Sequence, residues 1–199
     1  MRKNTDKENK KSTKIDLYKN IDELLEEKKS IVIAVEGSSA SGKTTLAKEL
    51  KKHYNCNVIP MDDFFLRPEQ RTKERLEEPG GNVDRERFYE EVVTPLVRGE
   101  IVEYRPFDCC TFTLKNAVKM YPNRLTIIEG AYSTHPELGK YYDLSVFLDV
   151  DSDLQKERIL KRNGQEKAEI FFYVWIPMEH KYFEMMSVKE RCDLVLPVL

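Results

Sequence analysis

The sequence predicts an α/β protein in which helices cover both faces of a parallel β-sheet. Residues 30–36, 125–129 and 144–149 are short, almost continuous apolar runs, as in strands that are buried on both sides. Segments with helical spacing of apolar or charged residues alternate with these runs. This alternation favours a parallel sheet with crossover helices.

The other elements follow from local signals along the chain. Strands are also expected at residues 57–61 and 194–196, and an extended segment, read as a β-ribbon, at 101–114. Residues 66–82 hold two prolines and two glycines and predict a loop or flap, and residues 163–169 predict a short polar break. Helices are expected at residues 15–28, 44–54, 85–96, 152–162 and 170–186.

Pro177 should bend or split the last of these helices. Six aromatic side chains of this segment are expected in the core: Phe171, Phe172, Tyr173, Trp175, Tyr182 and Phe183.

Length and composition indicate one domain at residues 15–199, preceded by a disordered polar tail at 1–14. The net charge of −2 argues against a nucleic-acid partner. No apolar run approaches the roughly 20 residues of a membrane span, and the first residues lack a secretory apolar region, so we expect a cytoplasmic protein. The cysteines and histidines show no metal-ligand spacing, and a homo-oligomer is left open.

The segment from Gly37 to Thr44 matches the pattern G-x-x-x-x-G-K-[ST] between a predicted strand and a predicted helix. In such a loop the backbone N–H groups face a phosphate, Lys43 reaches the terminal phosphates and Thr44 binds Mg²⁺. The sequence therefore predicts ATP and Mg²⁺ as ligands. The expected nucleotide-binding residues are Gly37, Ser38, Ser39, Ala40, Ser41, Gly42, Lys43, Thr44 and Thr45.

Acidic residues follow two of the predicted strands. Asp62 and Asp63 follow the strand at 57–61, and Glu129 ends the strand at 125–129. The carboxyl ends of parallel strands gather at one edge, so these side chains should lie beside the phosphate loop. One aspartate could accept a proton from an attacking hydroxyl or hold Mg²⁺, and Glu129 could organise Mg²⁺; the alternative for the aspartates is capping of a turn.

Other candidates lie outside the strands. Arg158 and Arg162 share a helix face and could clamp a transferring phosphoryl group, or pair with Glu157 or Glu166. Asp84 could bind a sugar hydroxyl or cap the helix after it. Tyr104, Phe107 and Asp108 offer stacking and hydrogen bonding to a substrate, or form an ordinary edge ribbon.

Taken in order, these motifs resemble the uridine kinase family, within the group that also holds pantothenate kinase and phosphoribulokinase. The resemblance rests on the phosphate loop, Met61–Phe65, Asn82–Asp84, Phe107–Asp108, Ile128–Gly130 and Arg158 with Arg162. The resemblance implies a P-loop NTPase fold: a five-stranded sheet with a substrate-side β-ribbon and a small lid, here at about residues 158–170.

The same resemblance implies roles for individual residues. Asp62 would be the base and a partner of Mg²⁺, Asp84 would hold ribose hydroxyls, Glu129 would serve Mg²⁺, and the two arginines would belong to the lid. The chain departs from the family at Asp63, at Phe65 and in lacking a histidine after Asp108.

We therefore expect an ATP-dependent kinase that acts on a small molecule, with the 5′-hydroxyl of uridine or cytidine as first choice. The alternatives are a kinase of another alcohol, namely pantothenate, a ribosyl cofactor precursor or a sugar phosphate, and a nucleotide-binding regulator without turnover. Six arginines are available for a phosphorylated substrate: Arg67, Arg71, Arg75, Arg85, Arg87 and Arg105.

Overall fold

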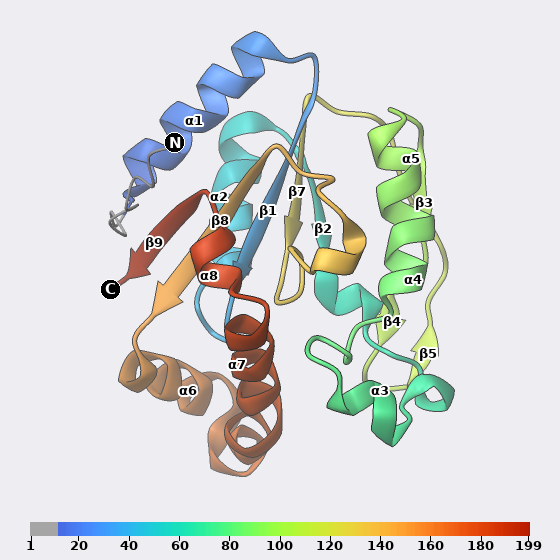
Figure 1. Ribbon diagram of the computed structural model, residues 1–199, viewed down its shortest axis with the longest axis vertical. Coiled ribbons are helices and arrows are strands. Elements are labelled where there is room, and N and C mark those ends of the chain that lie inside the picture. Colours follow the sequence, from blue (N-terminus) through green and yellow to red (C-terminus); the bar gives the residue numbers. More distant parts are fainter. Residues whose placement is uncertain (1–11) are drawn as a thin grey trace, which may run out of the picture.

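A five-stranded parallel sheet forms the centre of the protein (Figure 1). The computed structural model describes residues 12–199, so most of the predicted tail at 1–14 lies outside the described residues. The strand order is β2-β7-β1-β8-β9, which confirms the predicted fold class. The strands are β1 (Ile31–Gly37), β2 (Asn57–Pro60), β7 (Leu125–Glu129), β8 (Leu144–Val150) and β9 (Leu194–Val198).

The register of the sheet brings three strand ends to one edge. Glu129, the last residue of β7, pairs with Val35 of β1 on one side and with Pro60 of β2 on the other. The chain after each of these strands therefore leaves the sheet at the same place. This edge carries the predicted phosphate loop, Asp62 and Glu129.

One face of the sheet is covered by α1 (Lys14–Glu27) and α2 (Lys43–Tyr54). Leu17 and Ile21 of α1 and Leu50 of α2 are fully buried in the hydrophobic cluster under these helices. Thr13 caps α1: its hydroxyl accepts from the backbone N–H of Asp16. The prediction that residues up to 14 are a disordered tail is thus wrong at Thr13 and Lys14, because a capping box starts the helix there.

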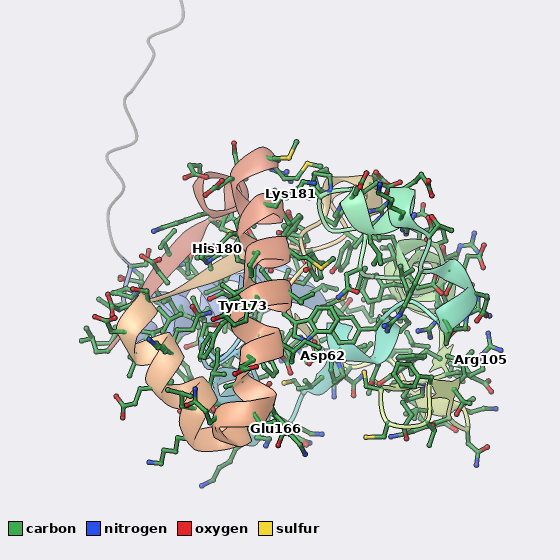
Figure 2. The ribbon with its side chains drawn as sticks, turned by 90° about the horizontal axis from the view of Figure 1, so that it is seen from below. Asp62, Arg105, Glu166, Tyr173, His180 and Lys181 are labelled. Carbon is green, nitrogen blue, oxygen red and sulfur yellow. The ribbon has the colours of Figure 1, made fainter. Side chains whose placement is uncertain are left out.

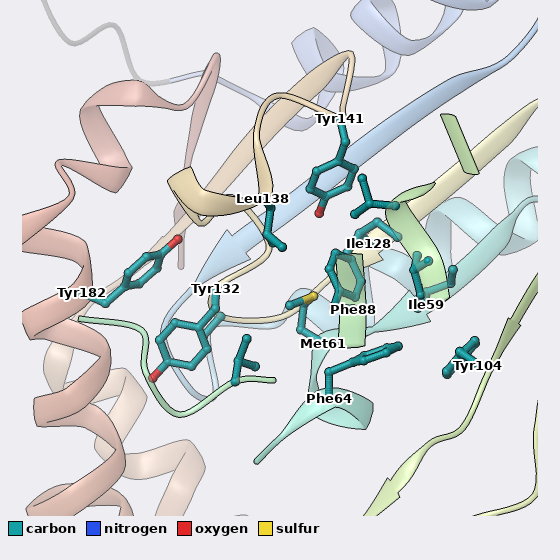
Figure 3. Close-up of a cluster of buried hydrophobic side chains, with 14 of the residues drawn as sticks. Ile59, Met61, Phe64, Phe88, Tyr104, Ile128, Tyr132, Leu138, Tyr141 and Tyr182 are labelled. Atoms are coloured by element: carbon teal, nitrogen blue, oxygen red, sulfur yellow. The ribbon is translucent and has the colours of Figure 1, made fainter. Parts of the chain in front are cut away.

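The second hydrophobic cluster lies on the other face and holds most of the buried aromatic rings (Figure 3). The rings of Phe64 and Phe88 meet edge to face at 5.0 Å, and the ring of Tyr182 reaches the cluster from the C-terminal helix α7 (Ile176–Met185). The predicted helix at 85–96 is present as α4 (Arg85–Phe88), a π-helical turn (Tyr89–Val93) and α5 (Thr94–Val97).

The predicted flap and ribbon are more structured than expected. The flap contains a 3-10 turn (Pro68–Gln70) and α3 (Lys73–Glu77), while a 3-10 turn (Met61–Phe64) follows β2. The extended segment forms two small antiparallel pairs in place of one ribbon, because the chain turns back twice. They are β3 (Val102–Tyr104) with β6 (Val118–Met120), and β4 (Phe107–Asp108) with β5 (Thr113–Leu114).

The C-terminal helices differ most from expectation. The span α6 (Ser152–Ile170) consists of two helices that meet at a kink at Gly164, which has φ 74° and ψ 167°, so the predicted polar break is present but shorter than expected. A π-helical turn (Phe171–Trp175) leads directly into α7, and Pro177 is the second residue of α7. The hydrogen-bonding pattern of the helix thus changes just before the proline, which cannot donate a backbone N–H. The chain then forms α8 (Val188–Arg191) and β9, and a 3-10 turn (Pro136–Leu138) precedes β8.

The prediction that the aromatic residues of 171–183 lie in the core is wrong for most of them. Only Tyr182 is buried among these six, and Tyr173 is 79% exposed. These helices extend beyond the sheet, so much of their surface has nothing to pack against. Within the described residues, no helix is both long enough and apolar enough to cross a membrane.

Candidate active site

The phosphate loop occupies residues 37–45, between β1 and α2. Gly37 has φ 140°, and a Cβ atom there would lie 2.8 Å from the carbonyl oxygen of Leu148 on β8. Only glycine lets the loop start so close to the neighbouring strand. Gly42, also left-handed, is the N-cap of α2, while Ala40 adopts φ 61° without being glycine.

Several donors of this loop are available to an anion. The backbone N–H groups of Ala40 and Gly42 have no hydrogen-bond acceptor among the described residues, and the first N–H groups of a helix lack intrahelical partners. The Lys43 ammonium donates to the carbonyl oxygens of Gly37 and Ser38, both at 2.8 Å. Donors converging at a helix N-terminus fit a phosphate chain.

Thr44 and Glu129, which the sequence analysis assigns to Mg²⁺, are in contact in the structure. The Thr44 hydroxyl donates to Glu129 Oε1 at 3.0 Å. Burial raises the pKa of Glu129, the Thr44 hydrogen bond and Lys43 oppose that shift, and the nearby charges of Asp62 and Asp63 add to it.

These oxygens fit Mg²⁺ only together with a nucleotide. The described residues hold no group of three or more His, Cys, Asp or Glu side chains placed to bind a metal alone. Mg²⁺ commonly takes one or two protein oxygens and completes its shell with substrate phosphates and water. Thr44 and Glu129 supply such oxygens at the loop.

The two aspartates after β2 have different surroundings. Asp62 is exposed, and its carboxylate forms no hydrogen bond or ion pair within residues 12–199. Asp63 Oδ2 accepts from the Tyr104 hydroxyl at 3.1 Å, and burial raises the pKa of Asp63, opposed by that bond. Figure 2 shows Asp62 between α7 and the side of the molecule that carries Arg105. Asp62 is therefore the aspartate free to meet a substrate.

Asp84 caps α4, which was one of its two predicted roles. Its Oδ1 accepts from the backbone N–H of Arg87 at 3.1 Å, and its Oδ2 accepts from the Gln70 amide at 2.9 Å. The Arg87 guanidinium lies 3.4 Å from the same carboxylate, and the side chain is almost fully buried. A hydroxyl would have to replace Gln70 to reach it.

The hairpin residues Phe107 and Asp108 serve local structure. Phe107 is buried, and Asp108 Oδ1 accepts from the backbone N–H of Cys110 at 2.8 Å. That bond is the main reason why the pKa of Asp108 is lowered, and Lys115 at 3.4 Å adds to it. Tyr104 lies closer to the acids, through its bond to Asp63.

The structure separates the two arginines that were predicted to act together. Arg158 Nη1 donates to the carbonyl oxygen of Ala40 in the phosphate loop at 3.3 Å. Arg162 donates to the Asn163 side chain and lies over the Phe171 ring, 5.3 Å from its centroid. Neither arginine pairs with Glu157 or Glu166 in the described chain.

Sequence reasoning missed two buried carboxylates at the loop. Glu36, directly before Gly37, accepts from the backbone N–H of Tyr132 at 3.0 Å and of Thr134 at 3.1 Å. Glu179 on α7 accepts from Ser39. An acid at the end of an apolar strand could have marked Glu36, whereas Glu179 lies in a charged helix without any local signal.

The phosphate loop, the Thr44–Glu129 pair and the aspartates after β2 lie together at one sheet edge. The model of the phosphoribulokinase / uridine kinase family matches residues 32–170, which include all of these residues. The chain belongs to this family.

Relatives agree with this assignment over most of the chain. A uridine kinase of Anoxybacillus flavithermus is 28% identical over 187 residues, covering 85% of this chain and 87% of the relative. A uridine kinase of Listeria monocytogenes is 27% identical, with 85% and 88% covered. A solved structure described as a "possible uridine kinase" from Bacillus stearothermophilus aligns with a TM-score of 0.63 at 22% identity, covering 91% of this chain and 99% of that one. The fold and the phosphate loop of this chain are therefore those of a P-loop kinase of this family.

Proposed function

We propose that the protein transfers the γ-phosphoryl group of ATP to the 5′-hydroxyl of a nucleoside, uridine or cytidine. The observation that carries the proposal is the Thr44–Glu129 pair at the phosphate loop, with the unpaired Asp62 at the neighbouring strand end. Curated relatives named uridine kinase, similar over 85% of the chain, support the nucleoside as acceptor.

The residues divide the reaction between them. The loop N–H groups and Lys43 hold the triphosphate. The oxygen of the substrate hydroxyl bonds to the γ-phosphorus while ADP leaves, and Asp62 accepts the proton of that hydroxyl. Thr44 and Glu129, together with the phosphates, would hold Mg²⁺, which would supply charge neutralisation. Arg158, already on the loop, offsets charge on the transferring group.

Asp84 is proposed to meet the ribose hydroxyls by exchanging its bond to Gln70 for bonds to the substrate. The amide that donates to this carboxylate at 2.9 Å belongs to Gln70 of the flap, so a substrate hydroxyl could replace it as the donor. Uridine should then be preferred over 2′-deoxyuridine, because the missing hydroxyl would leave a buried acceptor unpaired.

A second candidate acceptor is an alcohol that carries an anionic group. Of the six arginines named above for a phosphorylated substrate, Arg71 alone has no carboxylate within 4.0 Å in the described chain. Its Nε donates to Leu66 O at 3.0 Å, and its guanidinium lies over the Phe112 ring at 5.6 Å, which leaves its terminal nitrogens available. Pantothenate or a sugar phosphate would use such a donor.

The experiment is a transfer assay from ATP to uridine, cytidine, pantothenate and ribose 5-phosphate, with Lys43→Ala as the inactive control. We expect turnover with the nucleosides and a loss of at least about 10²-fold in Lys43→Ala, because a charge on the terminal phosphates is removed. Near-normal turnover of a folded Lys43→Ala protein would contradict kinase chemistry at this loop. Turnover with the anionic alcohols alone would replace the nucleoside by the second candidate.

A further inference from the structure

A carboxylate from the C-terminal helix α7 contacts the phosphate loop. Glu179 is 6% exposed. Its Oε2 accepts from the backbone N–H of Ser39 at 2.8 Å, and its Oε1 accepts from the Ser39 hydroxyl at 2.7 Å. No lysine or arginine of the described chain lies within ion-pair distance of it. Both carboxylate oxygens of Glu179 thus accept hydrogen bonds from Ser39 of the phosphate loop.

The charges around Glu179 do not neutralise it. Burial raises its pKa, Lys43 opposes this shift, and the charge of Asp62 adds to it. The Lys43 ammonium forms its own bonds with the carbonyl oxygens of Gly37 and Ser38. Glu179 also contributes to raising the pKa of Tyr132. The carboxylate is therefore a buried anion without a cation of its own.

The contact is held in place by the surrounding elements. Gln155 of α6 donates to the Ser39 carbonyl oxygen at 2.8 Å, so the N–H, hydroxyl and carbonyl of Ser39 are all engaged by C-terminal side chains. One turn after Glu179, the Tyr182 hydroxyl donates to Glu36 at 3.2 Å, directly before the loop. Glu179 and Tyr182, three residues apart on α7, thus both hold the helix against the loop.

A triphosphate and a carboxylate compete for such a loop. The loop binds phosphates through N–H groups like that of Ser39, and a like charge nearby disfavours a second anion. We propose that Glu179 is a positioning residue that sets nucleotide affinity: its negative charge on Ser39 opposes entry of the triphosphate. The proposal rests on the proposed function in taking MgATP as the ligand.

Glu179→Gln tests the charge while keeping the shape. The glutamine oxygen can accept from the Ser39 N–H and its NH₂ can donate to the Ser39 hydroxyl. We expect calorimetry to show MgATP binding about tenfold tighter in this variant, about 1.4 kcal/mol. The matched control is Glu184→Gln, an exposed acid of the same helix that does not touch the loop. It should bind MgATP like the wild type.

Each other result contradicts the proposal. Unchanged or weaker MgATP binding by Glu179→Gln would overturn the role of the charge and leave the kinase chemistry standing. A Glu179→Gln protein that fails to fold, judged by thermal unfolding, would show that the carboxylate is required for folding, which contradicts a role limited to setting nucleotide affinity. No MgATP binding by the wild type would overturn this proposal and the proposed function together.

Discussion

At the residue scale, the site depends on which of two adjacent aspartates is free. Asp63 is held by the Tyr104 hydroxyl, whereas Asp62 is exposed and unpaired in the described chain. A general base must reach the proton that it removes. The hydrogen-bond pattern therefore favours Asp62 as the general base, whereas Asp63 is already bonded to Tyr104.

The two aspartates can be told apart by amide substitution. Asp62→Asn should lower kcat by about 10²-fold or more, since general-base catalysis contributes about 10²–10⁴. Asp63→Asn should be milder, because its amide can still accept from Tyr104. Steady-state kinetics with saturating MgATP measure both, and calorimetry should show MgATP affinity almost unchanged. A larger loss in Asp63→Asn would reverse the assignment.

At the element scale, the flap of residues 66–82 is held by close backbone contacts. A Cβ atom at Gly81 would lie 1.8 Å from the carbonyl oxygen of Arg75. Arg75 donates to Gly81 O at 3.2 Å and pairs with Glu86 at 2.8 Å, and Lys181 of α7 donates to Glu77 O at 2.5 Å. The flap is thus tied both to itself and to the C-terminal helix.

Gly81→Ala should displace the flap from this position. Forcing a methyl group into packed space costs about 1–3 kcal/mol, and we expect that cost to fall locally on the flap. Limited trypsin digestion should then cut near Lys73 and Arg75 faster than in the wild type. Gly99→Ala is the control: its Cβ would meet nothing within 4 Å, although φ 68° costs about 1 kcal/mol. Equal cleavage rates in the flap of both variants would contradict the packing argument.

At the scale of the whole molecule, the fold collects buried and partly buried acids around the phosphate loop from distant parts of the chain. Burial raises the pKa of each of these carboxyl groups. They are Glu36, Asp63, Glu129 and Glu179. A folded state that binds protons more tightly than the unfolded chain loses stability as pH rises. The site therefore costs stability at neutral pH, and Mg²⁺ with a nucleotide would offset it.

The variant Glu129→Gln should reveal this loss of stability in the pH dependence of the unfolding free energy. Because the pKa of Glu129 is raised in the folded state, its contribution is most favourable below about pH 4.3, its ordinary value, and is lost as pH rises through the raised value. The unfolding free energy of Glu129→Gln should therefore increase relative to the wild type as pH rises above about 4.3. Urea unfolding at several pH values measures this difference. A difference independent of pH would contradict the prediction.

The sequence by itself determined the parallel sheet, the phosphate loop and the acid at the end of β7. These features depend on local patterns: an apolar run, a glycine spacing and a strand followed by a polar residue. It also assigned Thr44 and Glu129 to Mg²⁺, and the structure has these two side chains in contact.

Only the tertiary structure decided which side chains are free and which are already paired. Arg158 reaches Ala40 while Arg162 lies on Phe171, although both occupy one predicted helix face, because Gly164 and the helices after it redirect the chain. Glu179 and Ser39 are 140 residues apart in the sequence, and no local sequence pattern predicts a contact between residues so far apart. Such contacts depend on how α7 packs against the sheet edge, which long-range burial decides.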